Sequence, residues 1–125
     1  MHTDTATVRY MIDDVPAAVA FYTEHLGFTL EWDASPAFAS VVRGPLRLLL
    51  SGPGSSGAMP MPDGSKPLPG GWTRIQVQVD DIEGEVDRLR TAGLTFRNDV
   101  LRGVGGAQIL LDDPSGNPVE LFQPA

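Results

Sequence analysis

The sequence predicts an α+β fold built from two β-α-β-β-β modules, and two observations lead to this prediction. The chain of 125 residues contains one order of elements twice, around "YMIDDVPAAVAFYTEHLGFTL" and "VQVDDIEGEVDRLRTAGLTF". A segment rich in glycine and proline, residues 52–71, separates the two copies. Neither copy could bury a sheet face alone, so the two must pack together or pair across a dimer. We expect one domain over residues 1–125, with module 1 at about 5–51, a linker at 52–71 and module 2 at 72–125.

Each module begins with a short strand that leads into a helix. Apolar residues recur at helical spacing in both copies, at Val15, Ala18, Val19, Tyr22 and Leu26 and at Ile82, Val86 and Leu89. Asp14 and Asp81 stand where the N-cap of each helix belongs, because their side chains can accept from free backbone N–H groups. Gly27 and Gly93 follow the helices and are expected to end them.

Three strands are expected after each helix. In module 1 they are "FTLEWD", "AFASVVRG" and "LRLLLSG", and in module 2 "LTFRND", "AQILLDD" and "PVELFQ". Strand alternation turns Val119 and Leu121 toward the helix and Glu120 toward the opposite side. Residues 52–71 show no apolar periodicity and are expected to form a loop, whose Met59 and Met61 suit an adaptable apolar lid.

Composition excludes several classes of function. The net charge of −7, with one lysine, argues against nucleic-acid binding, which needs clustered positive charge. The absence of cysteine excludes disulfides, thiolate metal sites and cysteine nucleophiles. No apolar run is long enough to cross a bilayer, and "MHTDTATVRY" lacks the features of a signal peptide. We therefore expect a cytoplasmic protein that does not bind membranes.

Two motifs resemble a known superfamily. "DVPAAVAFYTEHLGF" and "DDPSGNPVELFQP" are similar to segments of the vicinal oxygen chelate superfamily, which includes glyoxalase I, bleomycin-resistance proteins, extradiol dioxygenases and fosfomycin-resistance enzymes. The resemblance implies that the modules form a curled mixed sheet around a central cavity. It also implies a homodimer, because members commonly build each cavity from modules of two chains. The fold hosts isomerases, lyases, dioxygenases and binding proteins, so the fold alone does not determine which of these functions the protein has.

The resemblance also implies four positions for metal ligands. Members that use a metal place one ligand in the first and last strand of each module, and these positions map here to Thr7, Arg47, Arg74 and Glu120. Arginine has no lone pair to donate and threonine is a poor ligand, so one carboxylate remains, which cannot hold zinc, nickel or iron alone. We expect neither a metal nor another cofactor.

The two histidines do not restore such a site. His2 lies in a terminus expected to be frayed, and His25 lies at the end of the first helix, where the helix dipole favours a surface histidine.

Without a metal, the cavity is expected to hold Arg47, Arg74 and Glu120 close together. Glu120 would pair with one arginine, since an unpaired buried charge is costly. The other arginine would be free to bind a carboxylate, phosphate or phenolate of a small molecule. Alternatively, all three residues form a buried network that holds the modules together, and the sequence leaves both interpretations open.

Strand alternation adds further candidates for binding a small molecule, aromatic or anionic. They share a face with the residues above and are Thr7, Arg9, Met11, Gln76, Gln78 and Phe122. Trp32, Phe38 and Trp72 could also offer flat surfaces to an aromatic ligand.

Three functions compete. The first is binding of a small molecule without a metal, as in resistance by sequestration. The second is a metal-free enzyme of the isomerase, lyase or dioxygenase type that uses Glu120 as an acid or base. The third is a metal-dependent enzyme whose ligands lie at other positions than those mapped here.

Overall fold

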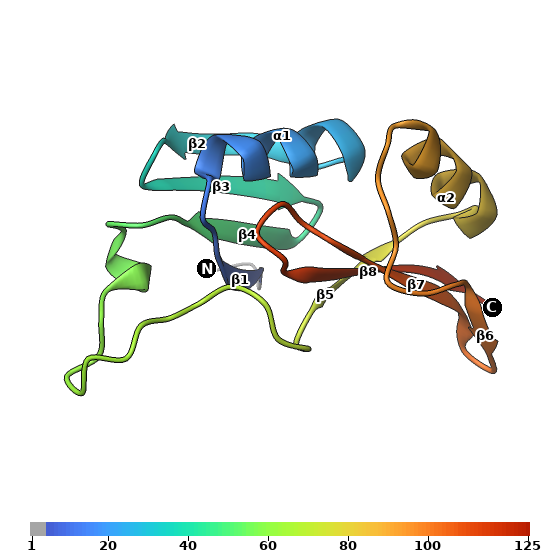
Figure 1. Ribbon diagram of the computed structural model, residues 1–125. Helices are drawn as coiled ribbons and strands as arrows, with labels where there is room; N and C mark the ends of the chain where they lie inside the picture. The colour runs from blue at the N-terminus through green and yellow to red at the C-terminus, as the bar shows by residue number, and fades with distance from the viewer. Residues whose placement is uncertain (1–4) are drawn as a thin grey trace. The chain divides into compact units, whose positions relative to one another are not determined.

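The computed structural model describes residues 5–125, which form two compact units. Unit 1 contains the chain up to Gly70 together with Pro114–Asn117, and unit 2 contains Gly71–Asp113 together with Pro118–Ala125. Each unit holds one four-stranded mixed sheet and one α-helix (Figure 1). The predicted α+β fold of two β-α-β-β-β modules is confirmed, with sheets that curl without closing.

In unit 1 the helix follows the first strand and precedes the other three. The elements are β1 (Ala6–Met11), α1 (Val15–His25), β2 (Thr29–Ala34), β3 (Phe38–Arg43), β4 (Leu46–Ser51) and the short 3-10 helix η1 (Ser56–Ala58). The strand order is β1-β4-β3-β2, in which β1 and β4 are parallel and the other neighbours antiparallel. The first and last strands of the module therefore lie side by side.

Helix α1 forms where the sequence predicts it. The Asp14 carboxylate accepts a hydrogen bond from the N–H of Ala17 at 3.1 Å, and Gly27 has the positive φ of 74° that lets the chain leave the helix. Apolar side chains of α1 and of the sheet are fully or almost fully buried, among them Val15, Ala18, Tyr22, Val41, Leu48 and Leu50. Each large one stabilises the fold by roughly 1.5–3 kcal/mol relative to an exposed side chain.

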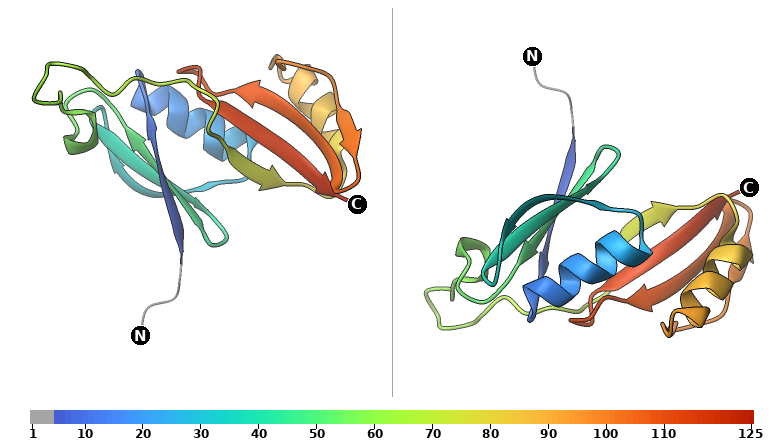
Figure 2. Two further views of the ribbon diagram at one scale, coloured as in Figure 1. Left: turned by 90° about the horizontal axis from the view of Figure 1, so that it is seen from below. Right: turned by 90° about the horizontal axis from the view of Figure 1, so that it is seen from above.

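Unit 2 repeats this architecture. Its elements are β5 (Ile75–Gln78), α2 (Ile82–Thr91), β6 (Leu101–Gly103), β7 (Gly106–Asp112) and β8 (Pro118–Pro124). The strand order is β5-β8-β7-β6, and β5 is parallel to β8 (Figure 2). Asp81 caps α2 by accepting from the N–H of Gly84 at 3.1 Å. The core of the unit consists of buried aliphatic residues from α2 and three strands, Ile75, Val77, Ile82, Val86, Leu89, Ile109, Leu111, Val119 and Leu121.

The prediction of a strand at "LTFRND" is wrong. Its only bridge within the described part of the chain joins Phe96 to Leu111, and the regular edge strand β6 begins later, at Leu101. The Asn98 side chain explains the difference. Its Oδ1 accepts the hydrogen bond of the Leu110 N–H at 2.9 Å, so a side chain takes the place of a strand carbonyl.

The segment rich in glycine and proline packs onto unit 1 as far as Gly70. Its 3-10 helix η1 contacts β1 and β4, and Ser55 just before it is buried. Met59 and Met61 are exposed, which is compatible with the expected lid, but a role as a lid stays a prediction.

The turn before β8 also belongs to unit 1. The Asn117 side chain is buried, donates to the carbonyl of Met11 at 2.8 Å and accepts from the N–H of Gly70 at 2.8 Å. The Ser115 hydroxyl accepts from the N–H of Asp13 at 2.8 Å. The motif "DDPSGNPVEL" thus supplies hydrogen-bond partners to residues far away in the sequence. Between residues 5 and 125, neither α-helix has the length and apolar character needed to span a membrane.

Candidate functional site

The candidate residues lie on the helix-free face of each sheet, by which we mean the face opposite the helix. In β8, Val119 and Leu121 belong to the core beside α2, and alternation turns Glu120 to the helix-free face, as predicted. Glu120 is nevertheless only 6% exposed. A carboxylate this buried requires partners that compensate for the water it has lost.

Both oxygens of the Glu120 carboxylate have such partners. Arg74 donates from Nε to Oε1 at 3.0 Å, and its Nη2 lies 3.0 Å from the same oxygen. Gln76, which lies directly opposite Glu120 in the parallel pair β5–β8, donates from Nε2 to Oε2 at 2.7 Å. The ion pair that we expected between Glu120 and an arginine is therefore present with Arg74. Both carboxylate oxygens therefore already accept hydrogen bonds from N–H donors of the protein itself.

Arg47 makes an ion pair of its own in unit 1. Its guanidinium grips Glu31 with two parallel bonds, Nε to Oε1 and Nη2 to Oε2, each 2.9 Å long. The Ser40 hydroxyl donates to Oε1 of the same carboxylate at 2.9 Å. Arg47 and then Ser40 lower the pKa of Glu31, and Glu31 raises the pKa of Arg47. The expectation that one of the two mapped arginines lacks a protein partner is therefore wrong.

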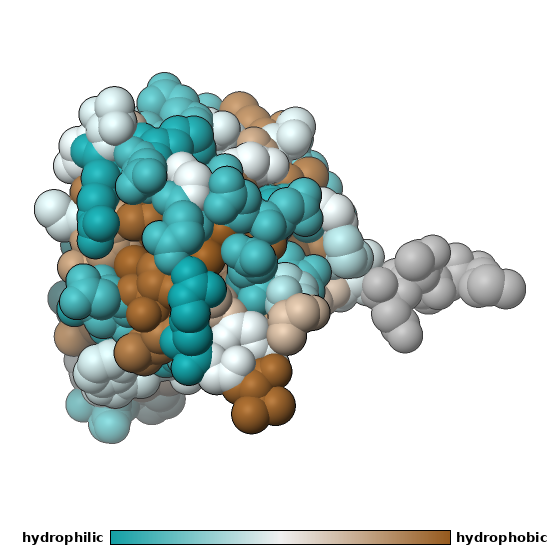
Figure 3. Space-filling model, turned by 90° about the vertical axis from the view of Figure 1, so that its right-hand side faces the viewer, coloured by the Kyte–Doolittle hydropathy of each residue, from teal (hydrophilic) through white to brown (hydrophobic). Residues whose placement is uncertain are grey.

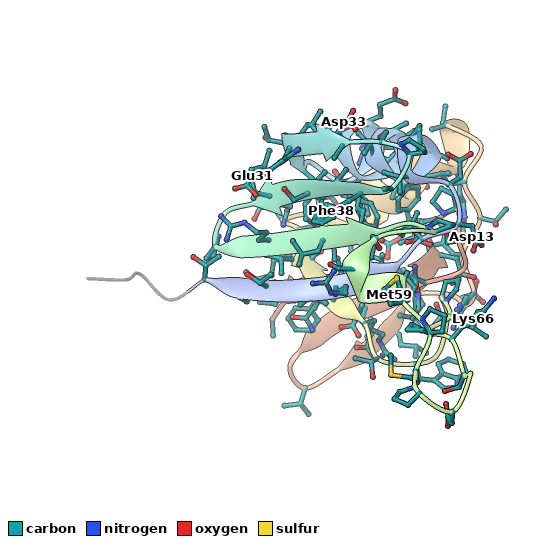
Figure 4. All side chains as sticks on the ribbon, turned by 90° about the vertical axis from the view of Figure 1, so that its left-hand side faces the viewer. Asp13, Glu31, Asp33, Phe38, Met59 and Lys66 are labelled. Carbon is teal, nitrogen blue, oxygen red and sulfur yellow. The ribbon has the colours of Figure 1, made fainter. Side chains whose placement is uncertain are left out.

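Glu31 is a residue that the sequence analysis missed. It lies in β2, whose six residues are all exposed, and Figure 4 shows it beside β3. The pairing register between β2 and β3 shifts between Leu30 and Trp32. Such a bulge breaks the two-residue alternation, so counting along the strand could not show which face Glu31 takes. The available signal was the isolated carboxylate between two large apolar residues in "LEWD".

The strand register corrects the alignment of the two modules. Arg9 pairs with Leu49, and Gln76 pairs with Glu120. Arg9 and Gln76 each stand five positions before the capping aspartate of their module, since 14 − 9 and 81 − 76 both equal 5. The counterpart of Glu120 is therefore Leu49, and the mapping to Arg47 is wrong. The turns that precede β4 and β8 differ in length, so the mapping to Arg47 was displaced by two residues.

Arg9 has a neutral partner only. Its Nη1 donates to the hydroxyl of the buried Ser51 at 2.7 Å. The backbone of η1 lies close to the same guanidinium, because a Cβ built on Gly57 would come within 2.2 Å of Nη1. Within residues 5–125, no carboxylate pairs with Arg9. Arg9 is thus an exposed residue whose charge no carboxylate among residues 5–125 neutralises.

The structure gathers the predicted residues into two sets, one in each unit. Thr7, Arg9, Met11 and Arg47 lie along β1 and β4, where Thr7 is paired opposite Arg47. Arg74 precedes β5, and Gln76, Gln78, Glu120 and Phe122 lie along β5 and β8. The convergence of Arg47 with Arg74 and Glu120 stays a prediction.

A cavity of about 280 Å³ adjoins the second set. Its lining comprises Leu101, Arg102, Gly103, Gly105, Gly106, Gln108 and Phe122. Gln108 pairs with Phe122 across β7 and β8, so both side chains lie on one face. Figure 3 shows the side of unit 2 that carries α2 and the β6–β7 hairpin, where apolar residues are interspersed with polar ones. The cavity therefore combines one aromatic ring with glycine backbone and a few polar groups.

The remaining candidates are three aromatic residues and the two histidines. Trp72 is 72% exposed and stacks on the Arg97 guanidinium, 5.2 Å from the ring centroid. Trp32 is exposed, and Phe38 is half-buried. His25 contacts Phe21 edge to face, with the ring centroids 6.1 Å apart. The expectation about His2 lies outside the described residues.

Comparisons with known proteins place the chain in a family. The family model described as Glyoxalase/Bleomycin resistance protein/Dioxygenase superfamily matches residues 5–121. The chain belongs to this superfamily, and the resemblance seen in the sequence is confirmed. No curated protein sequence matches the chain.

Three solved structures illustrate the range of the fold. A superfamily member from Sphaerobacter thermophilus DSM 20745 is 25% identical, with a TM-score of 0.77 and 98% of each chain covered. Lactoylglutathione lyase from Agrobacterium tumefaciens is 20% identical, with a TM-score of 0.77 and coverage of 98% of this chain and 94% of that one. TnmS3, an antibiotic binding protein from Streptomyces sp. CB03234, is 23% identical, with a TM-score of 0.75 and coverage of 99% and 98%.

The residues present do not fit the metal that many members of this fold use. With the corrected register, the four ligand positions hold Thr7, Leu49, Arg74 and Glu120. One is aliphatic, one is a cation, and the carboxylate among them is already bonded by Arg74 and Gln76. Among residues 5–125, no group of three or more histidine, aspartate or glutamate side chains is placed to hold a metal ion.

Proposed function

We propose that this chain binds a small organic molecule on the helix-free faces of its sheets without using a metal. The observation that supports this most directly is the bonding of Glu120. At the position where the resemblance implies a metal ligand, both carboxylate oxygens accept hydrogen bonds from Arg74 and Gln76. A metal would have to displace a guanidinium from a largely buried carboxylate and would gain one ligand.

Sequestration of the molecule, as in resistance, is the form of binding that we favour. The fold is compatible with it, because TnmS3 is described as an antibiotic binding protein and shares the fold over nearly its whole length. The same fold also serves a lactoylglutathione lyase, so the likeness alone does not separate binding from catalysis. The bonding of Glu120 favours the binding function over an enzyme that uses this residue as an acid.

The charges suggest which group of the ligand is recognised. Arg47 and Arg74 already hold Glu31 and Glu120, whereas the side-chain partner of Arg9 within residues 5–125 is the hydroxyl of Ser51. We therefore assign to Arg9 the role of receiving a carboxylate or phenolate, which a guanidinium can bind through two parallel bonds. In unit 2, the ring of Phe122 beside a cavity of about 280 Å³ offers a surface to a flat apolar body.

A thermal-shift screen tests the proposal with small aromatic acids, antibiotics and divalent metals. A ligand at about 100 times its Kd should stabilise the protein by about 2.7 kcal/mol, and Arg9→Gln should reduce the shift caused by acids. Arg88→Gln, which breaks an exposed pair on α2, is the matched control and should leave the shift unchanged. Neither zinc, nickel, manganese, iron or cobalt nor EDTA should change the melting temperature. Elemental analysis that finds about one equivalent of such a metal, removed by EDTA together with several degrees of melting temperature, would overturn the proposal.

We further propose that the chain is a homodimer and cytoplasmic. The dimer is the assembly that the superfamily commonly uses. Light scattering at micromolar concentration should give twice the monomer mass of 13.4 kDa. A mass equal to that of one chain would contradict the dimer while leaving the ligand proposal intact.

A further inference from the structure

A second cavity lies in unit 1, at the end where β1 and β4 finish. It has a volume of about 180 Å³, is partly open to solvent, and is bordered by Met11, Ile12 and Ser51 and by the segment that follows β4. This volume is below the 300–1,000 Å³ or so of sites for drug-sized ligands, so it suits a molecule about as large as an amino acid. From the sequence, this segment is expected to be a linker loop with a lid at Met59 and Met61, and Met11 is the only residue of the cavity lining among the predicted binding residues.

The walls of this cavity are mainly apolar. Ile12 is buried, Leu68 lies at the rim, and Ala58 and three prolines complete the apolar part, namely Pro53, Pro67 and Pro69. Prolines have no N–H, so the backbone there offers few donors. The Ser51 hydroxyl already accepts from Arg9. The polar character of the cavity therefore depends mostly on its charged side chains.

Two residues of opposite charge, Asp13 and Lys66, belong to the lining of the cavity. Figure 4 shows them on the side of unit 1 where the segment with Met59 folds back. Within residues 5–125, neither the Asp13 carboxylate nor the Lys66 ammonium makes a hydrogen bond or an ion pair. The backbone of Asp13 is nevertheless fixed, because its N–H donates to Ser115 at 2.8 Å. Both charges are thus available to a ligand.

The geometry points to a site for a small zwitterion with an apolar body. We propose that the cavity binds an apolar amino acid, with its ammonium group at Asp13, its carboxylate at Lys66 and its side chain against Ile12 and the prolines. A ligand that carries only one charge would leave either Asp13 or Lys66 without a counter-charge. It would also be repelled by whichever of these two side chains has the same sign. This inference goes beyond the proposed function, because it requires neither Arg9 nor the face that carries Glu120.

Nuclear magnetic resonance of the ¹⁵N-labelled protein tests the proposal with three compounds of one skeleton. They are L-leucine, 4-methylpentanoate, which lacks the amino group, and 3-methylbutylamine, which lacks the carboxylate. L-leucine should shift the amide signals of Ile12, Asp13, Lys66 and Leu68, and each analogue should bind about tenfold more weakly. Absence of these shifts at millimolar leucine, or equal affinity for all three compounds, would overturn the proposal.

Two substitutions assign the charges to the ligand's groups. Asp13→Asn should weaken leucine binding about tenfold and leave the binding of 4-methylpentanoate unchanged or stronger. Lys66→Gln should weaken leucine binding equally without weakening that of the amine. Glu24→Gln, which removes an exposed charge from α1, is the control and should have no effect. Equal leucine affinity in Asp13→Asn, Lys66→Gln and the parent would refute the assignment, whatever the thermal-shift screen finds for the helix-free faces.

Discussion

Replacing Glu120 by glutamine is expected to lower the free energy of unfolding by about 3 kcal/mol. Breaking one side of a buried ion pair typically costs about 3–5 kcal/mol, and the low end applies here because the Arg74 side chain is 29% exposed. The glutamine keeps the shape but leaves the guanidinium of Arg74 without its counter-charge. The glutamine has one oxygen and one NH2 group, so its NH2 group would face an N–H donor of either Arg74 or Gln76. Urea denaturation of the variant and the parent measures the difference.

The matched control is the other arginine–glutamate pair. Glu31→Gln breaks the pair between Glu31 and Arg47, in which both side chains are 37% exposed, so the loss should be much smaller than that of Glu120→Gln. The double variant of Glu120→Gln with Arg74→Gln should be more stable than additivity predicts, by more than about 0.5 kcal/mol. A Glu120→Gln variant that unfolds at the same urea concentration as the parent would show that the pair contributes nothing. Glu120 would then have no place in the candidate site.

Asn117→Ala should destabilise the protein by about 3 kcal/mol, an effect as large as that of Glu120→Gln. Asn117 is 3% exposed, and its amide group satisfies the carbonyl of Met11 and the N–H of Gly70 at once. Removing the amide leaves two backbone groups without partners, at about 1–3 kcal/mol for each buried group. The same denaturation experiment measures this loss.

The neighbouring turn residue gives the comparison for Asn117. Ser115→Ala removes a hydrogen bond to the N–H of Asp13, which is exposed and can be taken over by water. Its cost should stay within about 0.5 kcal/mol. Similar losses in the two variants would mean that the turn as a whole stabilises unit 1, and that the Asn117 amide has no special part in it.

The fold could be predicted because its determinants are local. Asp14 and Asp81 cap their helices as expected, and Gly27 leaves α1 in the left-handed conformation. Repetition of these signals in one chain was enough to predict two similar modules. The edge strand of module 2 was misplaced because Asn98 replaces a strand hydrogen bond with its side chain, an interaction that propensities do not show.

The candidate site could be predicted only in part. Alternation predicted that Glu120 lies on the helix-free face of β8 and pairs with an arginine, and the partner is Arg74, the residue just before the adjacent strand β5. The partner of Arg47 could not be found, because the bulge in β2 hides which way Glu31 points. The counterpart of Glu120 needed the strand register, which depends on the length of turns and is not determined by the residues of the strands themselves.

The inclusion of Pro114–Asn117 in unit 1 has a consequence for synthesis on the ribosome. Residue 117 is made 47 positions after Gly70, since 117 − 70 = 47, yet it supplies the partner of the Gly70 N–H and of the Met11 carbonyl. Chains emerge from the N-terminus and domains generally fold as units during translation. Unit 1 cannot complete its hydrogen bonds until almost the whole chain has been translated, so a nascent chain that stops after Gly70 must leave both backbone groups to water.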